Sequence, residues 1–500
     1  MGSSILSGFT AKSNMKDLTH LNSWHADWRE LRVVVLGLGV TGFSVADTLA
    51  ELGAKVLVVA EKADEELVDI LDVLEVKHLV GTAAAGVPDA VVEFKPELVI
   101  TSPGVNPNHE MINWCATKGV EVWIDIDLAW RLRDKTSRIA EWITITGTNG
   151  KTTTVQMVEA MLQAAGKRAV ACGNIGLPIL DAIRDPEGFD ALVLELSSFQ
   201  LHYLHHIEPY SSAVLNLADD HLDWHGSFEK YSDAKAKIYE NTKVACVYNV
   251  NDLATEKMVE NADVLEGARA IGFTTGLPSR SQVGYVEDIL CDRAFLDDRA
   301  NSALEVTTLS DLSSIGVLTP HLMANVAAAT ALARSFGVDA QHIKQALLDF
   351  RLDAHRIELV HEQDGIRWIS DSKATNPHAA AASLNSFDNI VWIVGGLLKG
   401  VDLSQLVKDY ASRIHAAIVI GKDRAEVLRA LSESPEISNV IEIDASDDVM
   451  HAAVKAAIQI ARPGDTVLLA PAAASMDQFK DYADRGNQFS QQVKIQLEKI

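Results

Sequence analysis

The chain contains a short glycine-rich run whose residue types suit the binding of phosphate groups. Its sequence is Gly147-Thr148-Asn149-Gly150-Lys151-Thr152, between an apolar run and a helical pattern. In such loops backbone amides wrap the phosphate oxygens, the lysine adds a point charge and the hydroxyl can reach Mg²⁺. The strict G-x-x-x-x-G-K-[ST] spacing is not met, because Ile145 stands where its first glycine would be. We interpret the run as a shortened form of that loop. The alternative is a helix that merely begins with Gly-Lys-Thr.

An acid and a histidine could hold a cation beside this loop. Glu195 ends the apolar run Asp190–Glu195, and His221 lies in the polar run Asn216–Asp223. An acid at the carboxyl end of a buried strand faces the ligand crevice of an α/β sheet, and it is costly there unless paired or bound to metal. Oxygen and nitrogen donors of this kind could meet a hard cation. For His221 the alternative is a helix-capping or hydrogen-bonded histidine.

Three polar runs in the last third of the chain each follow an apolar strand. They are Asp371–Asn376, Gly395–Lys399 and Pro471–Phe479. Because the carboxyl ends of parallel strands meet at one edge of a sheet, we expect the runs to converge on one rim. Their lysines and hydroxyls suit a small carboxylate substrate. Ordinary loop polarity, the alternative, explains one such loop well and three poorly.

A second glycine motif lies near the N-terminus. The run Gly37-Leu38-Gly39-Val40-Thr41-Gly42 is a G-x-G-x-x-G between a strand and a helix, typical of dinucleotide-binding folds. By itself it suggests an NAD-dependent oxidoreductase. Glu61 could contact a ribose, but it follows Gly42 by 19 residues and Gly37 by 24, so the expected spacing does not decide. The structural alternative is a glycine turn that only packs the helix on the strand.

The elements that must position these groups alternate between strand and helix. Strands are expected over 32–36, 55–59, 98–101, 121–124, 143–146, 191–195, 213–216, 366–370, 389–394, 416–420, 440–443 and 466–469, and helices over 42–52, 151–165 and 321–336. Short extended runs fill 283–309. Alternation of this kind predicts the α/β class with mostly parallel sheets. We expect an N-terminal extension over 1–30 and three domains, over 31–138, 139–349 and 350–500.

Composition narrows the class of protein. Apolar residues make up 48% of the chain, charged residues 23%, and the net charge is −25. This charge disfavours general attraction to nucleic acid or anionic membrane. The four cysteines include no C-x-x-C pair, so neither a disulfide framework nor a zinc site is indicated. No apolar segment predicts a signal peptide or membrane span, so we expect a cytoplasmic protein.

Together these motifs resemble those of the Mur ligase family over nearly the whole chain after Arg32. The run at 147–152 marks the wider family, while the runs at 196–201, 371–376 and 474–479 resemble its D-glutamate-adding members. The resemblance implies an N-terminal Rossmann-like domain that binds UDP, a central P-loop ATPase-like domain and a C-terminal Rossmann-like domain. The implied reaction joins D-glutamate to UDP-N-acetylmuramoyl-L-alanine through an acyl phosphate. It uses ATP and two Mg²⁺ ions, and the implied enzyme is a monomer with small-molecule partners.

The resemblance also implies roles for individual residues. Those at ATP are Gly147, Thr148, Asn149, Gly150, Lys151, Thr152, Thr153, Asn325, Arg356 and Asp371. Those at the UDP substrate are Val40, Thr41, Ser102, Gly104 and Asn174. Those facing the amino acid and the reacting phosphate are Lys373, Thr375, Lys399, Ser475 and Tyr482. Lys151, Glu195, His221, Lys235, Lys373 and Lys399 would act in catalysis, with Thr152, Glu195, His221 and Lys235 at the metals.

Lys235 matches a lysine that carries a carbamate in the family. An unmodified ammonium 4 Å from Mg²⁺ would be repelled by roughly 8 kcal/mol at an effective dielectric constant of 20. A carbamate reverses the sign of the charge and supplies two oxygens. The alternative is a solvated helix lysine, as expected for Lys237.

The sequence departs from the family at two places, and other functions stay open. Ala60-Glu61-Lys62 stands where uracil contacts are expected, and Leu322 replaces a frequent asparagine, although Asn325 remains. The nearest alternative is another Mur ligase or a folylpolyglutamate synthetase with the same ATP loop. An NAD-dependent oxidoreductase leaves Lys151 unexplained. A non-catalytic nucleotide-binding regulator is disfavoured by the joint presence of the acid, the histidine and the lysine expected at the metals.

Overall fold

The computed structural model describes residues 17–437, 439–444 and 448–498. These residues form two compact units, each described here by itself. The first contains 17–144, 167–210 and 240–243, and the second contains 145–166, 211–239 and 244–498. The first sixteen residues of the expected N-terminal extension lie outside the described residues. The remainder, 17–30, packs on the first unit, where Ser23 Oγ and the Trp24 N–H donate to the carboxylate of Asp134.

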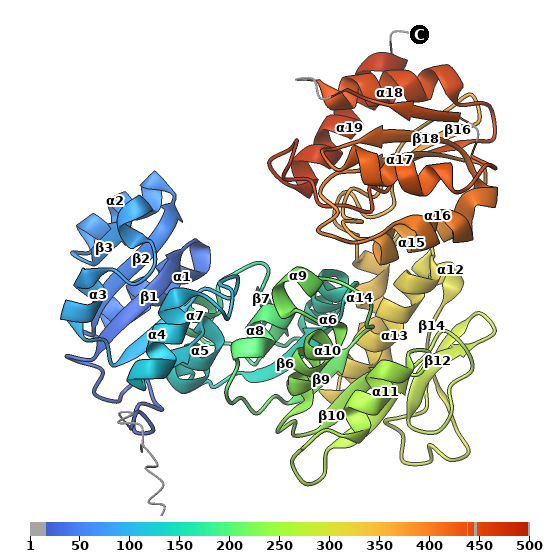
Figure 1. The fold of residues 1–500 in the computed structure, drawn as a ribbon. Helices are drawn as coiled ribbons and strands as arrows, with labels where there is room; N and C mark the ends of the chain where they lie inside the picture. Colours follow the sequence, from blue (N-terminus) through green and yellow to red (C-terminus); the bar gives the residue numbers. More distant parts are fainter. Residues whose placement is uncertain (1–16, 438, 445–447, 499–500) are drawn as a thin grey trace, which may run out of the picture. The chain divides into compact units, whose positions relative to one another are not determined.

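The first unit contains a five-stranded parallel sheet with helices between its strands (Figure 1). The strand order is β3-β2-β1-β4-β5. In chain order the elements are β1 (Arg32–Leu38), α1 (Val40–Glu51), β2 (Lys55–Ala63), α2 (Glu65–Val73), β3 (Lys77–Val80), η1 (Gly81–Ala84), α3 (Asp89–Phe94), β4 (Leu98–Thr101), α4 (Glu110–Lys118), β5 (Glu121–Trp123) and α5 (Asp125–Leu132). The order reverses beside β1, which is where such sheets bind ligands.

The first unit also includes a parallel strand pair and two short helices. These are β7 (Ala169–Gly173), α7 (Ile179–Ile183), β8 (Ala191–Glu195) and α8 (Ser198–Tyr203). Polar contacts join α7 to α1. Ser44 Oγ donates to Asp181 Oδ1 at 2.7 Å, and the Arg184 guanidinium donates to Asp47 and pairs with Glu51 at 2.9 Å. The dinucleotide-type sheet is therefore tied to the β7–β8 segment by charged groups.

Replacing Arg184 by alanine should lower the free energy of unfolding by about 1–3 kcal/mol, since its side chain is only 22% exposed, Asp47 loses this donor and Glu51 keeps only Lys135. Arg29 is the matched control, because it also pairs with an aspartate, Asp27, but its side chain is 76% exposed. Its replacement should cost much less, because an ion pair between exposed side chains contributes little to stability. Chemical denaturation of both variants measures the difference, and equal losses would contradict the prediction.

The second unit begins with the end of β6 (Glu141–Thr146) and the long helix α6 (Lys151–Ala164). Its strands run in the order β14-β13-β12-β11-β10-β9, parallel from β9 to β12 and antiparallel beyond. The elements are β9 (Ser211–Val214), α9 (Leu222–His225), α10 (Phe228–Ala236), η2 (Lys237–Tyr239), β10 (Ala245–Asn249), α11 (Leu253–Glu260), β11 (Arg269–Phe273), β12 (Gln282–Val286), β13 (Ile289–Asp292), β14 (Leu304–Thr308), α12 (Leu309–Leu312), α13 (Pro320–Ser335) and α14 (Ala340–Asp349). The alanine-rich α13 packs against strands β9 to β12 and against α6.

The rest of the second unit is a six-stranded sheet covered on both faces (Figure 1). The order β15-β16-β20-β17-β18-β19 is parallel except for the hairpin β15–β16. Helices α15 to α17 cover one face and α18 and α19 the other, each with its own apolar core. The elements are β15 (Glu358–Gln363), β16 (Ile366–Ser370), α15 (Pro377–Asn385), β17 (Ile390–Gly395), α16 (Ser404–Tyr410), η3 (Ala411–Arg413), β18 (Ile414–Ile420), α17 (Arg424–Ser432), β19 (Asn439–Glu442), α18 (Val449–Ile460), β20 (Thr466–Leu469) and α19 (Tyr482–Leu497).

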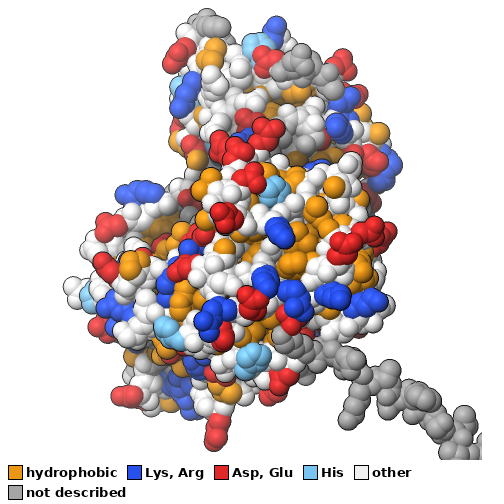
Figure 2. Space-filling model, turned by 90° about the vertical axis from the view of Figure 1, so that its left-hand side faces the viewer, with side chains coloured by type: hydrophobic (Ala, Val, Ile, Leu, Met, Phe, Trp, Pro, Cys, Tyr) orange, Lys and Arg blue, Asp and Glu red, His pale blue; other side chains and the backbone are white. Residues whose placement is uncertain are grey.

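The structure contains every strand and helix expected from the sequence, with shifted ends in some cases. The strand expected over 213–216 is β9, which ends at Val214 because Leu215 and Asn216 turn to bond Thr146 and the glycine loop. The four cysteines are buried and form no disulfide, as expected. Among the described residues, no helix combines the length and apolarity needed to cross a bilayer. On the face shown in Figure 2, basic and acidic side chains lie interspersed.

Candidate active site

The run 147–152 forms a tight loop between β6 and the start of α6. Gly147 and Gly150 have φ angles of +155° and +82°, the second of which favours glycine. Gly150 caps α6 without any side-chain hydrogen bond, and the N-terminus of a helix generally favours anions. Lys151 Nζ folds back and donates to the carbonyl oxygens of Gly147 at 2.9 Å and Thr148 at 3.0 Å. This geometry is compatible with a phosphate-binding loop at the start of α6.

The segment after β9 braces this loop. The Asn149 N–H donates to Asn216 Oδ1 at 2.9 Å, and Asn216 Nδ2 donates back to the Asn149 carbonyl at 3.0 Å. The Thr148 hydroxyl lies 2.8 Å from the Tyr231 hydroxyl and accepts from the Ala218 N–H. Sequence reasoning named Asn216 only as part of a run and missed Tyr231. Asn216 lies just after a strand, as Glu195 lies at the end of one. That position could have marked Asn216 as a candidate site residue.

Asn325 reaches the loop from α13, 175 residues further along the chain. A Cβ atom placed on Gly150 would lie only 2.4 Å from Asn325 Oδ1. The structure therefore places Asn325 against the end of the loop, where the resemblance assigned it a nucleotide contact.

Lys235 is buried beneath the loop. Its side chain is in α10, the residue is 2% exposed, and Nζ donates to Thr146 Oγ1 at 3.2 Å and to the Gly147 carbonyl at 2.9 Å. The centre of the Tyr231 ring lies 4.9 Å from Nζ. The alternative of a solvated helix lysine is therefore wrong, whereas Lys237 in η2 is half-buried.

His221 has a left-handed backbone and precedes α9. Its φ angle is +52°, and its Nε2 lies 3.6 Å from Asp220 Oδ2. Burial lowers the pKa of His221, the charge of Asp220 opposes this, and Lys399 and Lys151 lower it further. A neutral imidazole can accept a proton or bind a metal.

In the first unit, the structure brings Glu195 and Asn174 together at the carboxyl ends of β8 and β7. Glu195 is 2% exposed, its Oε1 accepts from Asn174 Nδ2 at 2.9 Å, and its carbonyl accepts from the Asn174 N–H. In the described part of the chain, no cluster of three or more His, Cys, Asp or Glu side chains is arranged to hold a metal. The oxygen donors present suit Mg²⁺, which in phosphate sites takes one or two carboxylates plus substrate oxygens.

The first glycine motif lies at the carboxyl ends of β1 and β4. A Cβ on Gly37 would lie 2.4 Å from Ser102 Oγ, and one on Gly42 would lie 2.1 Å from the Gly37 carbonyl. Val40 is 67% exposed on the first turn of α1, beside the half-buried Thr41. Gly42 thus packs the helix on the strand. Val40 and Thr41 lie on the same turn, and Ser102, which directly follows β4, approaches it at Gly37. Gly104 lies three residues after β4, and a Cβ added to it would meet no atom within 4 Å.

The three polar runs of the last third converge, as the sequence predicted. They follow β16, β20 and β17, which are adjacent and parallel. Leu397 and Ala474 exchange backbone hydrogen bonds of 2.9 and 3.0 Å, and the Ala472 N–H donates to the Ala374 carbonyl at 3.0 Å. Lys373 Nζ lies 3.9 Å from the centre of the Tyr482 ring. The three loops carry four of the residues assigned to the amino acid and the reacting phosphate, which are Lys373, Thr375, Lys399 and Ser475. The fifth, Tyr482, begins α19 and contacts Lys373.

Asp371 begins the first of these runs and is buried. It accepts from the Ser383 hydroxyl and from the Ile357 N–H at 3.3 Å. Burial raises the pKa of Asp371 to about 6, against the opposing effect of its hydrogen bonds and of Arg356. At neutral pH it is mostly ionised, and its charge interacts with that of Arg356, which the resemblance also assigned to the nucleotide.

The pKa of Asp371 predicts a pH dependence of stability. The folded chain keeps the Asp371 proton up to about pH 6, whereas the unfolded chain loses it near pH 3.8, the ordinary value for an aspartate. The free energy of unfolding should therefore fall as pH rises from about 4 to about 6 and then level off. An Asp371→Asn variant should lack this contribution. Unfolding midpoints of both proteins between about pH 4 and pH 7 test it, and a constant difference between them would contradict it.

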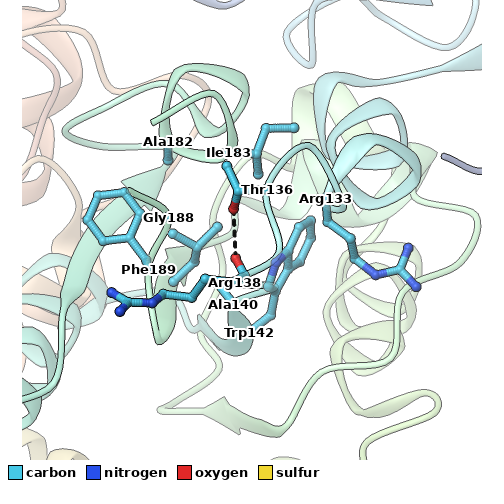
Figure 3. Close-up of a pocket in the computed structure, with 10 residues that line it drawn as sticks. Arg133, Thr136, Arg138, Ala140, Trp142, Ala182, Ile183, Gly188 and Phe189 are labelled. Carbon is cyan, nitrogen blue, oxygen red and sulfur yellow. Dashed lines mark hydrogen bonds between the residues drawn. The ribbon is translucent and has the colours of Figure 1, made fainter. Parts of the chain in front are cut away.

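A separate cavity lies in the first unit (Figure 3). The side chains of Trp142, Ile183 and Phe189 surround it, and the Thr136 hydroxyl donates to the Arg138 carbonyl at its edge. Its interior is about 10 Å³, which is room for one water molecule. It is too small for a nucleotide, so the loops at the strand ends remain the candidate site.

Family models match most of the chain. Residues 31–124 match the MurD-like N-terminal domain of Mur ligases, residues 145–333 the Mur ligase middle domain, and residues 355–473 the glutamate ligase domain of Mur ligases. The chain belongs to the Mur ligase family. Its relatives include a UDP-N-acetylmuramoylalanine--D-glutamate ligase of Leifsonia xyli, 56% identical over 96% of this chain and 95% of that protein. A Streptomyces coelicolor protein of the same name is 49% identical over 92% of this chain and 97% of that protein.

Solved structures share the fold at low identity. The UDP-N-acetylmuramate-alanine ligase MurC of Thermotoga maritima has a TM-score of 0.54 and 18% identity, covering 93% of this chain and 99% of that chain. The MurF ligase of the same organism, solved with ADP, has a TM-score of 0.54 and 17% identity, covering 94% of this chain and 96% of that chain. The expected fold class, three α/β domains with mostly parallel sheets, is confirmed.

Proposed function

We propose that this chain is an ATP-dependent ligase that joins D-glutamate to UDP-N-acetylmuramoyl-L-alanine, a step of peptidoglycan precursor synthesis. The observation that carries the proposal is the 56% identity, over nearly the full length of both chains, to a protein with this activity in its name. The phosphate loop, the turn at 37–42 and the lysine-bearing rim supply the three kinds of site that the reaction requires.

ATP would bind with its phosphates on the 147–152 loop. The backbone amides at the start of α6 and the Lys151 ammonium offset the charge of the phosphates. Thr152 and His221 in the second unit, and Glu195 in the first, would each offer a ligand to Mg²⁺. Bound Mg²⁺ would offset the repulsion between the substrate carboxylate and the γ-phosphate. Attack of that carboxylate on the γ-phosphate forms an acyl phosphate and ADP. The amine of D-glutamate then displaces phosphate to form the amide.

The rim of the six-stranded sheet would bind D-glutamate. Its lysines, Lys373 and Lys399, match the two carboxylates of this amino acid in charge, and Thr375 and Ser475 offer hydroxyl donors. In the first unit, Val40, Thr41, Ser102, Gly104 and Asn174 would bind the UDP substrate. The N-terminal N–H groups of α1, which begins in the turn at Gly37–Gly42, would contact the diphosphate.

Lys235 would carry a carbamate and bind a second Mg²⁺. A buried amine beside carbonyl and hydroxyl oxygens is held in place and shielded from solvent. A carbamate would turn this group into an oxygen donor for a cation. Density for one added CO₂ on Lys235 is expected in a crystal grown with bicarbonate, and density for a plain ammonium would refute the modification.

Phosphate release in the presence of UDP-N-acetylmuramoyl-L-alanine, with and without D-glutamate, tests the function. Turnover should require both, and a panel of other amino acids should give much less. Turnover with another amino acid and none with D-glutamate would instead favour a different Mur ligase or a folylpolyglutamate synthetase. Binding of NAD would favour the oxidoreductase alternative.

A further inference from the structure

Arg485 is a completely buried arginine in α19. It is 0% exposed, and its guanidinium contacts two of the three loops of the rim. Nε donates to Ser372 Oγ at 3.0 Å, Nη2 donates to the Ser372 carbonyl at 2.9 Å, and Nη1 donates to the Ala473 carbonyl at 3.1 Å. Arg485 is not among the residues assigned above to the substrates.

The charge of Arg485 is not matched by an ion pair. Within the described ranges, no carboxylate lies within 4.0 Å of its guanidinium, and its acceptors are neutral oxygens. Burial lowers the pKa of Arg485 to about 10, opposed by the charge of Asp477, so it remains a cation at neutral pH. A buried cation without an ion-pair partner lowers the stability of the fold. We therefore expect Arg485 to have a functional role.

The contacts of Arg485 extend to the rim residues. Ser372 Oγ, which accepts from Arg485, donates in turn to the Tyr482 carbonyl at 2.7 Å. Ser372 directly precedes Lys373, whose ammonium lies over the Tyr482 ring. On the other side, Ala473 precedes Ala474, which exchanges backbone hydrogen bonds with Leu397, two residues before Lys399. The guanidinium therefore joins two of the loops directly, and the third is joined to them by the hydrogen bonds between Ala474 and Leu397.

We propose that Arg485 is a positioning residue for the anionic amino acid. It holds the loops 371–376 and 471–479 at a fixed separation, and its charge, which no carboxylate pairs directly, adds to the positive potential of Lys373 and Lys399. The proposal rests on the proposed function, which assigns this rim to the amino-acid substrate. A low-dielectric surrounding strengthens the field of such a charge, so it acts on a bound carboxylate without touching it.

The test compares Arg485→Met with Arg413→Met in the full chain. Arg413 is the control, because it also donates to two backbone carbonyls, those of Asn385 and Phe387, but at the opposite end of the same sheet. Unlike Arg485 it is partly exposed and pairs with Asp388. For the amino acid that the wild-type chain uses, KM should rise on the order of tenfold or more in Arg485→Met and should be unchanged in Arg413→Met. KM for ATP should be unchanged in both.

Further variants separate charge from geometry and guard against misfolding. Arg485→Lys keeps the charge but not the three-way contact, so its KM should lie between those of wild type and Arg485→Met.

If Arg485→Met does not fold, Ser372→Ala removes the link to Tyr482 while keeping the arginine, and its KM for the amino acid should rise selectively. An unchanged KM for the amino acid in a folded Arg485→Met, or equal rises for amino acid and ATP, would overturn the proposal. Absence of wild-type turnover with D-glutamate would instead refute the proposed function.

Discussion

A Lys151→Met variant is expected to lose phosphate release by a factor of at least about 10² to 10³, the usual cost of removing one preorganised donor to a developing charge. Lys151 Nζ donates to the carbonyl oxygens of Gly147 and Thr148. The ammonium that would contact the phosphates therefore also stabilises the conformation of the loop. Methionine keeps most of the length of the side chain and removes the charge. Steady-state phosphate release with saturating substrates measures the loss.

Lys257→Met is the control for this substitution. Lys257 is an exposed lysine on α11 of the same unit, so its removal changes the net charge equally without touching the loop. Its phosphate release should match the wild type. Full activity of Lys151→Met, with the same melting temperature, would mean that the triphosphate does not bind on the 147–152 loop.

Gly150→Ala should impair ATP use more than it impairs folding. The φ angle of +82° costs an alanine about 1–2 kcal/mol. The new Cβ would also lie 2.4 Å from Asn325 Oδ1, so the amide must move away from the loop. Because Asn325 and the start of α6 would both face the nucleotide, we expect kcat/KM for ATP to fall by about one to two orders of magnitude, as misplaced binding groups commonly cost.

The other end of α6 supplies the control. Gly166 has a φ angle of +75° and no atom within 4 Å of an added Cβ. Gly166→Ala should therefore show a similar loss of stability, about 1–2 kcal/mol, with normal kinetics. If both variants had equal kcat/KM for ATP, the contact with Asn325 would have no role in nucleotide binding.

Much of the local structure could be predicted because it depends on neighbouring residues. The run 147–152 was expected to join a strand to a helix, and β6 and α6 flank it in the structure. Apolar runs predicted β8, β16 and β20 with the observed ends. The convergence of three loops on one rim also followed, since parallel strands place their carboxyl ends on one edge and the alternating pattern implied parallel strands.

Contacts between distant segments could not be predicted in this way. Asn216 braces Asn149 from 67 residues away, and Asn325 approaches Gly150 from α13. The burial of Lys235 depends on how α10 packs beneath β6, and the same residue types would give a solvated lysine on an outward helix face. Arg485 belongs to no sequence motif and was not predicted as a site residue, although its buried guanidinium contacts two loops of the rim.

The sequence by itself therefore determined which elements form and which chemical groups end each strand. The reason is that the periodicity of apolar residues and the glycine turns set the backbone conformation through residues that are close in the sequence. The tertiary structure alone decided which of those groups meet. Strand order and helix packing bring residues more than a hundred positions apart within hydrogen-bond distance, as between Arg485 and Ser372, and no local pattern encodes such a pairing.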